Sequence, residues 1–397
     1  MIHVGHVLDT LKQIPDNSVH CCWTSPPYYG LRSYGTAPQI WDDTSDYSVH
    51  YHTFDTKGFC GCGAWQGHLG LEPTPELFVK HLTDIFREVR RTLHPSGVCW
   101  VNIGDSYKNK NLIGIPWMTA FALRADGWYL RSDIIWAKGL SFCPSYVGRI
   151  MPESVKDRPN KSHEYMFLLT KSDKYFYDHV TVAEKGSGRI PGNKKFQKNS
   201  NEDSLKVRNG LGKQDGLLSA QQQPQMTRNI RTVWTIPVKP FKGAHFATAP
   251  MALVEPCIKA GSSEHGVCGE CGNPWMRVIT KSKPSADAYK LVGGDKDGNY
   301  TGQATKPYTG SLAQNASDTK RNILNSMKVV STTSWKASCD CNASIVPATV
   351  LDPFFGAGTT GLAAQQLGRA YVGCELNPDY AKMAQERIDG AKTLYDL

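Results

Sequence analysis

The chain has 397 residues, of which 40% are hydrophobic and 20% are charged. This length is enough for one large or two modest domains with a buried core, and the composition is ordinary for a globular protein. No apolar run reaches the length of about eighteen residues that a membrane-spanning helix needs, and Met1–Gly5 lacks the pattern of a signal peptide. We therefore expect a cytoplasmic protein without a membrane partner.

The formal net charge is +9, and the basic residues are concentrated in one part of the chain. Residues 181–245 contain twelve Lys or Arg and four Asp or Glu. Such a segment favours contact with a phosphate backbone, although a solvated basic loop has the same charge pattern. Residues 183–227 also lack hydrophobic periodicity, which predicts a mobile basic arm.

The first informative strand is Val19–Trp23, a short apolar run that leads into Thr24–Tyr28, with the sequence Thr-Ser-Pro-Pro-Tyr. Proline has no N–H to donate and a fixed φ, so the two prolines form a stiff ledge at the C-terminal end of the strand. Open α/β sheets bind ligands at that end. The serine hydroxyl, the carbonyls and the flat tyrosine ring suit a planar ring that carries an amino group. A structural Pro-Pro turn is the alternative.

A polar stretch with few periodic apolar positions covers residues 36–70. It contains His50, His52, Cys60 and Cys62, which are side chains of the types that bind zinc. The Cys-x-Cys spacing is tighter than in the usual knuckle, so unligated thiols and histidines are the alternative.

From residue 74 onward, helix and strand patterns alternate. Thr74 as N-cap and Pro75 in the first turn predict a helix, which His94–Gly97 is expected to end. Further strands are predicted at 98–103, 132–136 and 164–169, and further helices at 116–125 and 251–260. This alternation indicates a mostly parallel sheet covered by helices.

Another segment, Arg228–Ile236, alternates Arg and Thr with apolar residues. This pattern predicts a half-buried strand. We expect its Arg228 and Arg231 to meet phosphates or guanine edges.

Four cysteines in the last third of the chain are spaced like metal ligands. Cys268 and Cys271 form a Cys-x2-Cys pair, and Cys339 and Cys341 form a second pair after 67 intervening residues. We expect a structural zinc ion in a small ribbon with an inserted polar loop, with free thiols as the alternative. Four thiolates leave no open coordination position, so a catalytic metal is not expected here.

Near the C-terminus, Val350–Gly361 has the pattern of a strand, a Gly-rich turn and a helix start. A second apolar strand, Tyr371–Cys374, is followed by Glu375. Glycines let the backbone approach a cofactor closely, and an acid at the tip of the next strand can hold ribose hydroxyls. This pattern predicts a cofactor site.

The Ser-Pro-Pro-Tyr motif at 24–28 and the Phe-x-Gly-x-Gly motif within 352–360 together resemble those of the beta-type DNA amino-methyltransferases. That family transfers a methyl group from S-adenosylmethionine to N4 of cytosine or N6 of adenine. The resemblance implies a Rossmann-like α/β methyltransferase fold, which is a mostly parallel sheet with helices on both faces. It also implies a circularly permuted motif order and an inserted recognition segment, to which the cysteine spacing adds a small zinc ribbon.

The resemblance also implies a domain organisation. We expect residues 1–180 to be the catalytic half of the methyltransferase domain, with the polar insert at about 36–70. The remaining segments are a basic target-recognition segment at 181–230, a return to the methyltransferase domain at 231–262, the zinc ribbon with a disordered loop at 263–346, and the cofactor-binding half at 347–397.

By the same resemblance, the Ser25 hydroxyl and the Pro26 carbonyl hold the exocyclic amine of a flipped base, and Tyr28 is the stacking surface. No covalent intermediate and no strong base are expected. The implied catalytic residues are Ser25, Pro26, Pro27 and Tyr28. The implied cofactor-binding residues are Thr24, His245, Phe246, Asp352, Phe354, Gly356, Gly358, Thr359, Thr360, Glu375 and Asn377. The expected DNA contacts are Arg228 and Arg231 of the alternating segment, together with Arg32 in the flexible, partly basic loop 30–35.

Serine at position 25 is associated in the family with N4-cytosine enzymes, and Asp or Asn more often with N6-adenine enzymes. N4 of cytosine is therefore the expected target and N6 of adenine the alternative. Double-stranded DNA is the implied partner, the resemblance allows a cognate restriction endonuclease, and the sequence does not determine the oligomeric state. A non-catalytic, zinc-stabilised DNA-binding protein and a structural-RNA methyltransferase are the rival classes.

Two residues, His6 and Cys257, bear on the comparison with methyltransferase motifs. His6 follows Gly5 where family members commonly carry an acid, which departs from the pattern. Cys257 follows Pro256, and cytosine-C5 methyltransferases use a Pro-Cys thiolate as nucleophile. Because Cys257 falls within a predicted helix and in the wrong motif order, we expect it in the core.

Overall fold

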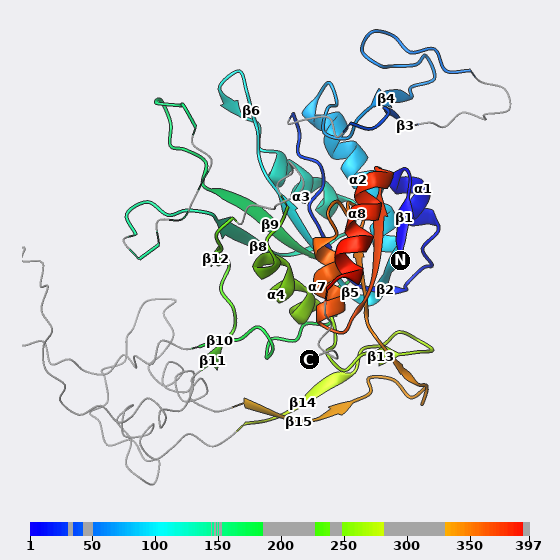
Figure 1. Ribbon diagram of the computed structural model, residues 1–397, viewed down its shortest axis with the longest axis vertical. Coiled ribbons are helices and arrows are strands. Elements are labelled where there is room, and N and C mark those ends of the chain that lie inside the picture. Colours follow the sequence, from blue (N-terminus) through cyan, green and yellow to red (C-terminus); the bar gives the residue numbers. More distant parts are fainter. Residues whose placement is uncertain are drawn as a thin grey trace, which may run out of the picture. The chain divides into compact units, whose positions relative to one another are not determined.

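The computed structural model describes residues 1–30, 35–42, 51–143, 145, 146, 148, 150, 153–185, 227–238, 248–281 and 330–391. The chain forms two compact units (Figure 1). Unit 1 comprises Met1–Val182, Arg231–Met276 and Trp335–Leu397, and unit 2 comprises Ala183–Ile230 and Arg277–Ser334. Within the described ranges, no helix has the length and apolar character needed to cross a membrane.

Unit 1 is built on an eight-stranded sheet in the order β1-β18-β17-β2-β5-β9-β8-β12. Its strands are β1 (Ile2–Val4), β2 (Val19–Thr24), β5 (Leu93–Ile103), β8 (Tyr129–Ala137), β9 (His163–Thr170), β12 (Val233–Thr235), β17 (Thr349–Asp352) and β18 (Ala370–Glu375). Every neighbouring pair is parallel except the two that involve β9, which runs antiparallel to β5 and to β8. The expected mostly parallel sheet is confirmed, with β9 as the one reversed strand among those described.

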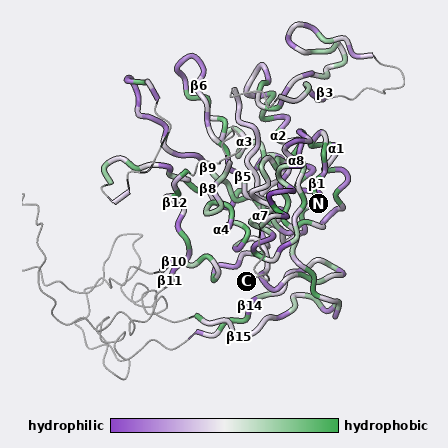
Figure 2. The backbone as a smooth tube through the Cα atoms, viewed as in Figure 1, coloured by the Kyte–Doolittle hydropathy of each residue, from purple (hydrophilic) through white to green (hydrophobic). Residues whose placement is uncertain are grey.

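Helices cover both faces of this sheet. They are α1 (Val7–Lys12), α2 (Pro75–Thr92), α3 (Ile115–Ala125), α4 (Met251–Gly261), α7 (Thr359–Gln366) and α8 (Pro378–Asp389). Side chains alternate along β2, so Cys22 packs in the core shared with α1, α2 and α3. Its neighbour Cys21 points to the other face, where its Sγ lies 3.9 Å from the carbonyl oxygen of Cys257 in α4. Hydrophobic residues accordingly run along the central strands in Figure 2.

Helix α2 begins as the sequence predicts, because the Thr74 side chain accepts a hydrogen bond from the Leu77 N–H at 3.3 Å. The helix ends at Thr92, just before His94–Gly97 as expected. Strand β5 already begins at Leu93, so it starts earlier than the strand predicted at 98–103 and includes these four residues. A register shift in the pairing of β2 with β5 absorbs the extra residues.

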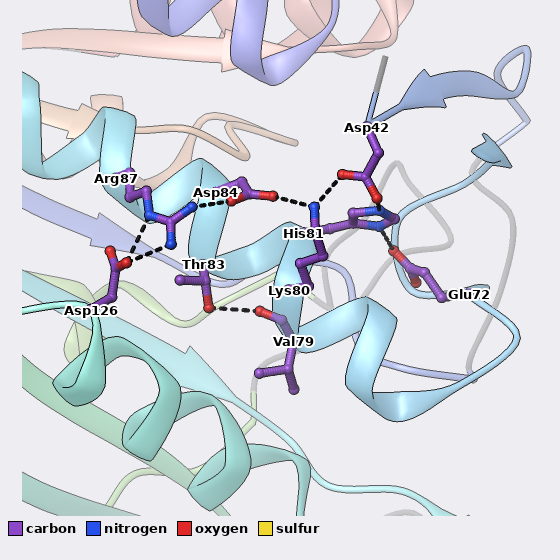
Figure 3. Close-up of polar contacts among 9 residues, drawn as sticks. All are labelled: Asp42, Glu72, Val79, Lys80, His81, Thr83, Asp84, Arg87 and Asp126. Atoms are coloured by element: carbon purple, nitrogen blue, oxygen red, sulfur yellow. Dashed lines mark hydrogen bonds and ion pairs between the residues drawn. The ribbon is translucent and has the colours of Figure 1, made fainter. Parts of the chain in front are cut away.

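A buried histidine of α2 ties a small hairpin to the helix (Figure 3). The hairpin consists of β3 (Gln39–Trp41) and β4 (Trp65–Gly67). The His81 ring stands between two carboxylates, with Nδ1 2.9 Å from Glu72 Oε1 and Nε2 3.2 Å from Asp42 Oδ2. Its faces stack against Trp41 and Trp65, with ring centroids 4.9 and 5.6 Å away. The hairpin is therefore anchored by both apolar and polar contacts.

Four further two-stranded sheets are described. They pair β6 (Tyr107–Lys108) with β7 (Asn111–Leu112), β10 (Glu184–Lys185) with β11 (Thr227–Arg228), β13 (Val267–Cys268) with β16 (Ile345–Val346), and β14 (Met276–Lys281) with β15 (Val330–Lys336). The single strand predicted at Arg228–Ile236 is wrong, because β11 and β12 are separate strands. Residues 229–232 between them belong to neither strand, with a bend at Thr232, and the Asn229 side chain accepts a hydrogen bond from the Ile230 N–H at 3.0 Å.

Candidate active site

The two motif-bearing strands lie side by side in unit 1. β17 pairs with β2 in parallel, through Val350 with Cys21 and Leu351 with Cys22. Parallel strands end at the same edge of a sheet, so the Ser-Pro-Pro-Tyr ledge and the glycine turn are neighbours. Their strand ends are joined directly by a hydrogen bond of 2.7 Å from Thr24 Oγ1 to Asp352 Oδ1, and both side chains are buried.

One cavity of about 610 Å³ opens at this edge. That volume is in the range of pockets for small ligands, roughly 300–1,000 Å³. The predicted site residues that line the cavity are Ser25, Pro26, Pro27, Tyr28, Asp352, Phe354, Gly356, Thr359, Thr360 and Glu375. The structure thus brings together residues that the sequence separates by more than three hundred positions.

Asp352 is the polar centre of the glycine turn. Besides the bond from Thr24, it accepts one from Thr360 Oγ1 at 2.6 Å and one from the Phe354 N–H at 3.0 Å. Burial outweighs these three donors and raises the pKa of Asp352 to about 7. The carboxyl group therefore orders the turn and the start of α7.

Glu375 lies at the end of β18 and faces the turn from the neighbouring strand. Its Oε2 accepts from the Gly356 N–H at 2.7 Å and its Oε1 from the Asn377 N–H at 2.9 Å. Burial raises the pKa of this carboxyl group. Each oxygen still has a lone pair available, so Glu375 can accept further hydrogen bonds from a ligand in the cavity.

Three predicted cofactor residues are absent from the described cavity wall. Thr24 forms the bond to Asp352. Gly358 has a φ of 72° and lies against α8, where an added Cβ would approach the Ala384 Cβ to 2.8 Å. The side chain of Asn377 caps α8 by accepting from the Asp379 N–H at 2.9 Å.

Tyr28 is held by a polar network across the cavity. Its hydroxyl donates to Glu164 Oε2 at 2.7 Å and accepts from Asn102 Nδ2 at 2.5 Å, and Ser25 Oγ donates to it at 3.3 Å. Glu164 also pairs with Lys138. Burial, followed by the charge of Glu164, raises the pKa of the Tyr28 hydroxyl well above its ordinary value.

The ring of Tyr28 has a defined position because Gly104 leaves room for it. A Cβ at Gly104 would lie 2.6 Å from the tyrosine ring. The neighbouring Asp105 lines the cavity, and its Oδ1 accepts from the Gly114 and Ile115 N–H groups at 3.0 Å each. Asp105 thus fixes the start of α3, as expected of an acid in a strand-end turn.

Sequence reasoning assigned no catalytic role to Asn102, Lys138 or Glu164. All three lie at the cavity edge of the sheet, near the ends of β5 and β8 and at the beginning of β9. The available signal was a polar or charged residue at the end of an apolar strand. For Glu164 that signal misleads, because only an antiparallel β9 brings its first residues to this edge.

The cavity wall also includes His6 and Trp41. Their rings meet edge to face with centroids 4.5 Å apart. His6 Nε2 is buried and has no hydrogen-bond partner among the described residues, and burial lowers the pKa of this histidine. The position where the motif pattern expected an acid therefore carries a neutral aromatic ring.

The family model N6_N4_Mtase, described as DNA methylase, matches residues 19–269 and 342–386. The chain is also 32% identical to the Type II methyltransferase M.Cfr9I of Citrobacter freundii, over 98% of this chain and 87% of the relative. This chain belongs to the N6_N4_Mtase family of DNA methylases.

A second relative of this DNA methylase is the Type II methyltransferase M.SmaI of Serratia marcescens, which is 30% identical over 98% of this chain and 90% of the relative. Among solved structures, the PvuII DNA methyltransferase (cytosine-N4-specific) aligns with 98% of this chain and 87% of its own, at 14% identity and a TM-score of 0.49.

Away from its cavity, the DNA methylase has a four-cysteine cluster. The Sγ atoms of Cys268, Cys271, Cys339 and Cys341 all lie within 4.8 Å of one another. Asn273 Nδ2 donates to the Cys271 sulfur at 3.2 Å. The cluster is attached to the beginning of the central strands, because the Cys271 carbonyl lies 3.2 Å from His94 Nε2 and the Gly272 carbonyl lies 3.1 Å from His20 Nε2.

Of the remaining predicted residues, Arg32, His50, His245 and Phe246 lie outside the described residues. Arg228 is exposed in unit 2 and pairs with Glu184 at 3.1 Å, and Arg231 is exposed in unit 1. Cys257 is buried within α4, and burial raises the pKa of its thiol well above the ordinary value, which confirms it as a core residue.

Proposed function

We propose that this DNA methylase transfers the methyl group of S-adenosylmethionine to N4 of a flipped cytosine in double-stranded DNA. The observation that carries the proposal is the Thr24–Asp352 bond, which joins the two motif strands beside one shared cavity. The ledge can hold the acceptor amine on one side of that cavity, and the glycine turn can hold the methyl donor on the other. We further infer that the catalytic motif precedes the cofactor motif through a circularly permuted chain order.

The residues at the glycine turn fit S-adenosylmethionine. Gly356 has a φ of 49°, and an added Cβ would meet only its own turn, at 4.0 Å, so the backbone there is open to a ligand. Glu375 offers lone pairs suited to the ribose hydroxyls, and the N-terminus of α7 at Thr359 suits the methionine carboxylate. When bound, the cofactor supplies a methyl group that its sulfonium already activates.

The chain's own residues then need to position the base. The Ser25 hydroxyl and the Pro26 carbonyl accept hydrogen bonds from the exocyclic amine and draw its lone pair out of conjugation with the ring. Tyr28 provides a stacking face whose orientation is fixed by Asn102 and Glu164. The protonated product amine is acidic, so its proton can pass to solvent without a strong base.

The choice of cytosine rests on Ser25, because a neutral hydroxyl in this motif is associated with N4-cytosine enzymes. The alternative target is N6 of adenine. The test is to incubate the enzyme with DNA and an isotopically labelled methyl donor, digest the DNA and identify the modified nucleoside. N4-methylcytosine supports the proposal, whereas N6-methyladenine as the only product contradicts it. Donor binding without transfer would instead support a non-catalytic DNA-binding protein.

We also propose that the four-cysteine cluster binds a structural zinc ion. The donor set fits, since four thiolates within 4.8 Å can surround one tetrahedral ion. The cluster contacts His20 near the beginning of β2, whereas Ser25 follows its end, and five strand residues span about 16 Å. The zinc would therefore stabilise the fold without reaching the reacting groups. Cys339→Ser with Cys341→Ser is expected to lower the zinc content by about one equivalent, as measured by elemental analysis.

The segment at 181–230 is proposed as the target-recognition region, and Arg228 within it and Arg231 directly after it are the proposed DNA contacts. Both side chains are exposed, and the basic surplus in this part of the chain supports phosphate binding. The relatives named above are Type II methyltransferases, so a restriction endonuclease that reads the same site is the proposed partner. Replacing both arginines with glutamine is expected to weaken DNA binding and to reduce its dependence on salt concentration.

A further inference from the structure

The loop between β3 and β4 contains a second group of metal-binding side chains. One ring nitrogen of His52 and the Sγ atoms of Cys60 and Cys62 all lie within 4.8 Å of one another. Among the described residues, no fourth His, Cys, Asp or Glu side chain joins this group. We propose that His52, Cys60 and Cys62 bind a zinc ion that orders this loop. The proposal does not depend on which base the enzyme methylates.

The local backbone explains why three ligands converge. His52 and Phe54 point to the same side of their segment because side chains alternate along an extended chain, and their rings stack at 5.4 Å. An antiparallel bridge pairs Phe54 with Cys60, which brings His52 to the side where Cys60 lies. The chain then reverses in a tight turn, closed by a 2.9 Å hydrogen bond from the Gly63 N–H to the Cys60 carbonyl. That turn presents Cys62.

The residues of the turn at 60–64 favour its tight backbone conformation. Gly63 has a φ of 96°, which residues with a side chain rarely adopt. The Cys60 N–H donates to the Ala64 carbonyl at 2.8 Å, so the backbone of the turn is satisfied internally.

The separations fit a tetrahedral zinc ion. With Zn–S near 2.3 Å and Zn–N near 2.0–2.1 Å, a tetrahedral angle places a sulfur and a nitrogen ligand about 3.5 Å apart. Cys62 Sγ lies 3.5 Å from His52 Nδ1. Cys60 is buried, whereas His52 and Cys62 are half-buried, so the group is enclosed on one side and open to ion entry on the other. One imidazole and two thiolates form a donor set that selects zinc over magnesium or calcium.

The position of the loop gives the zinc a role next to the active site. Gln39 and Trp41 at the beginning of the hairpin and His68 and Leu69 after its end line the cavity. Trp65 Nε1 donates to the Lys57 carbonyl at 3.1 Å, which links the loop to the hairpin that His81 anchors (Figure 3). An ion at His52, Cys60 and Cys62 would cross-link residues 52–62 next to the hairpin that contributes to that wall.

The test is the zinc content of the full-length enzyme, purified without chelators and measured by elemental analysis. Cys60→Ser with Cys62→Ser is expected to contain about one zinc equivalent less than the wild type. Cys143→Ser is the matched control, because this half-buried thiol belongs to neither metal-binding group and contacts Ser145 Oγ at 3.3 Å. It is expected to retain the full zinc content.

A second variant separates loss of the zinc ion from misfolding of the enzyme. His52→Ala keeps both thiols and is expected to release the loop zinc to a competing chelator faster than the wild type, with an unchanged far-UV circular dichroism spectrum. The zinc of the four-cysteine cluster is counted separately with Cys339→Ser and Cys341→Ser. Unchanged zinc content in the Cys60 and Cys62 double variant overturns the proposal, as does an intact mass that shows a Cys60–Cys62 disulfide.

Discussion

The bond between Thr24 and Asp352 can be removed without changing the shape of the core. Its Oγ1–Oδ1 distance is 2.7 Å, and Thr24 is 0% and Asp352 3% exposed. Thr24→Val preserves the branched side chain but removes the donor. Above pH 7 the Asp352 carboxylate is ionised, since its pKa is about 7. Loss of a buried hydrogen bond to a charged group costs about 1.5–3 kcal/mol of unfolding free energy.

The lower part of that range is expected, because Asp352 keeps its bonds from Thr360 and from the Phe354 N–H. The assay is urea unfolding at about pH 8, followed by tryptophan fluorescence, with the slope on denaturant checked for constancy. Affinity for S-adenosylmethionine, measured by calorimetry, is expected to fall together with stability, because the ledge and the glycine turn lose their direct link.

Thr119→Val is the matched control. Thr119 in α3 is 1% exposed, and its hydroxyl is buried without a hydrogen-bond partner among the described residues. The same chemical change there removes an unsatisfied group and should be neutral or stabilising, within about 1 kcal/mol. Equal destabilisation by the two variants, or none in Thr24→Val, would refute the reasoning.

Three other outcomes are expected. Ser25→Ala should lower the rate of methyl transfer by about 10²–10³-fold while donor affinity is unchanged. A single-turnover rate near that of the wild type would contradict the proposed hydrogen bond between the Ser25 hydroxyl and the exocyclic amine. Glu164→Gln should slow transfer with little change in DNA affinity, because it removes the ion pair to Lys138 and weakens the anchor of Tyr28; equal losses in both would point to a folding defect. Burial raises the Asp352 pKa from 3.8 to about 7, so its contribution to stability is complete below about pH 4 and is lost as pH rises through 7. Asp352→Asn should therefore flatten the loss of stability between about pH 4 and pH 7, and an unchanged pH profile by thermal unfolding would contradict this.

Local patterns in the sequence were sufficient for the elements that carry the motifs. Val19–Thr24 is a buried strand because it is mostly apolar and the prolines that follow it stop the ladder. The start of α2 followed from Thr74 and Pro75. Both signals act within a few residues, so they need no knowledge of distant partners. The strand predicted over Arg228–Ile236 failed for the same reason, since alternation alone did not register that residues 229–232 interrupt the strand.

The sequence by itself determined which residues stand at strand ends and glycine turns, because backbone conformation there depends on local chemistry. Only the tertiary structure decided which of those ends meet. It joined Thr24 to Asp352 across 328 positions through strand order, and it turned β9 around so that Glu164 reaches Tyr28. The order and direction of the strands are set by how much apolar area the whole sheet buries. That total depends on all the strands together, so no short run of residues encodes it.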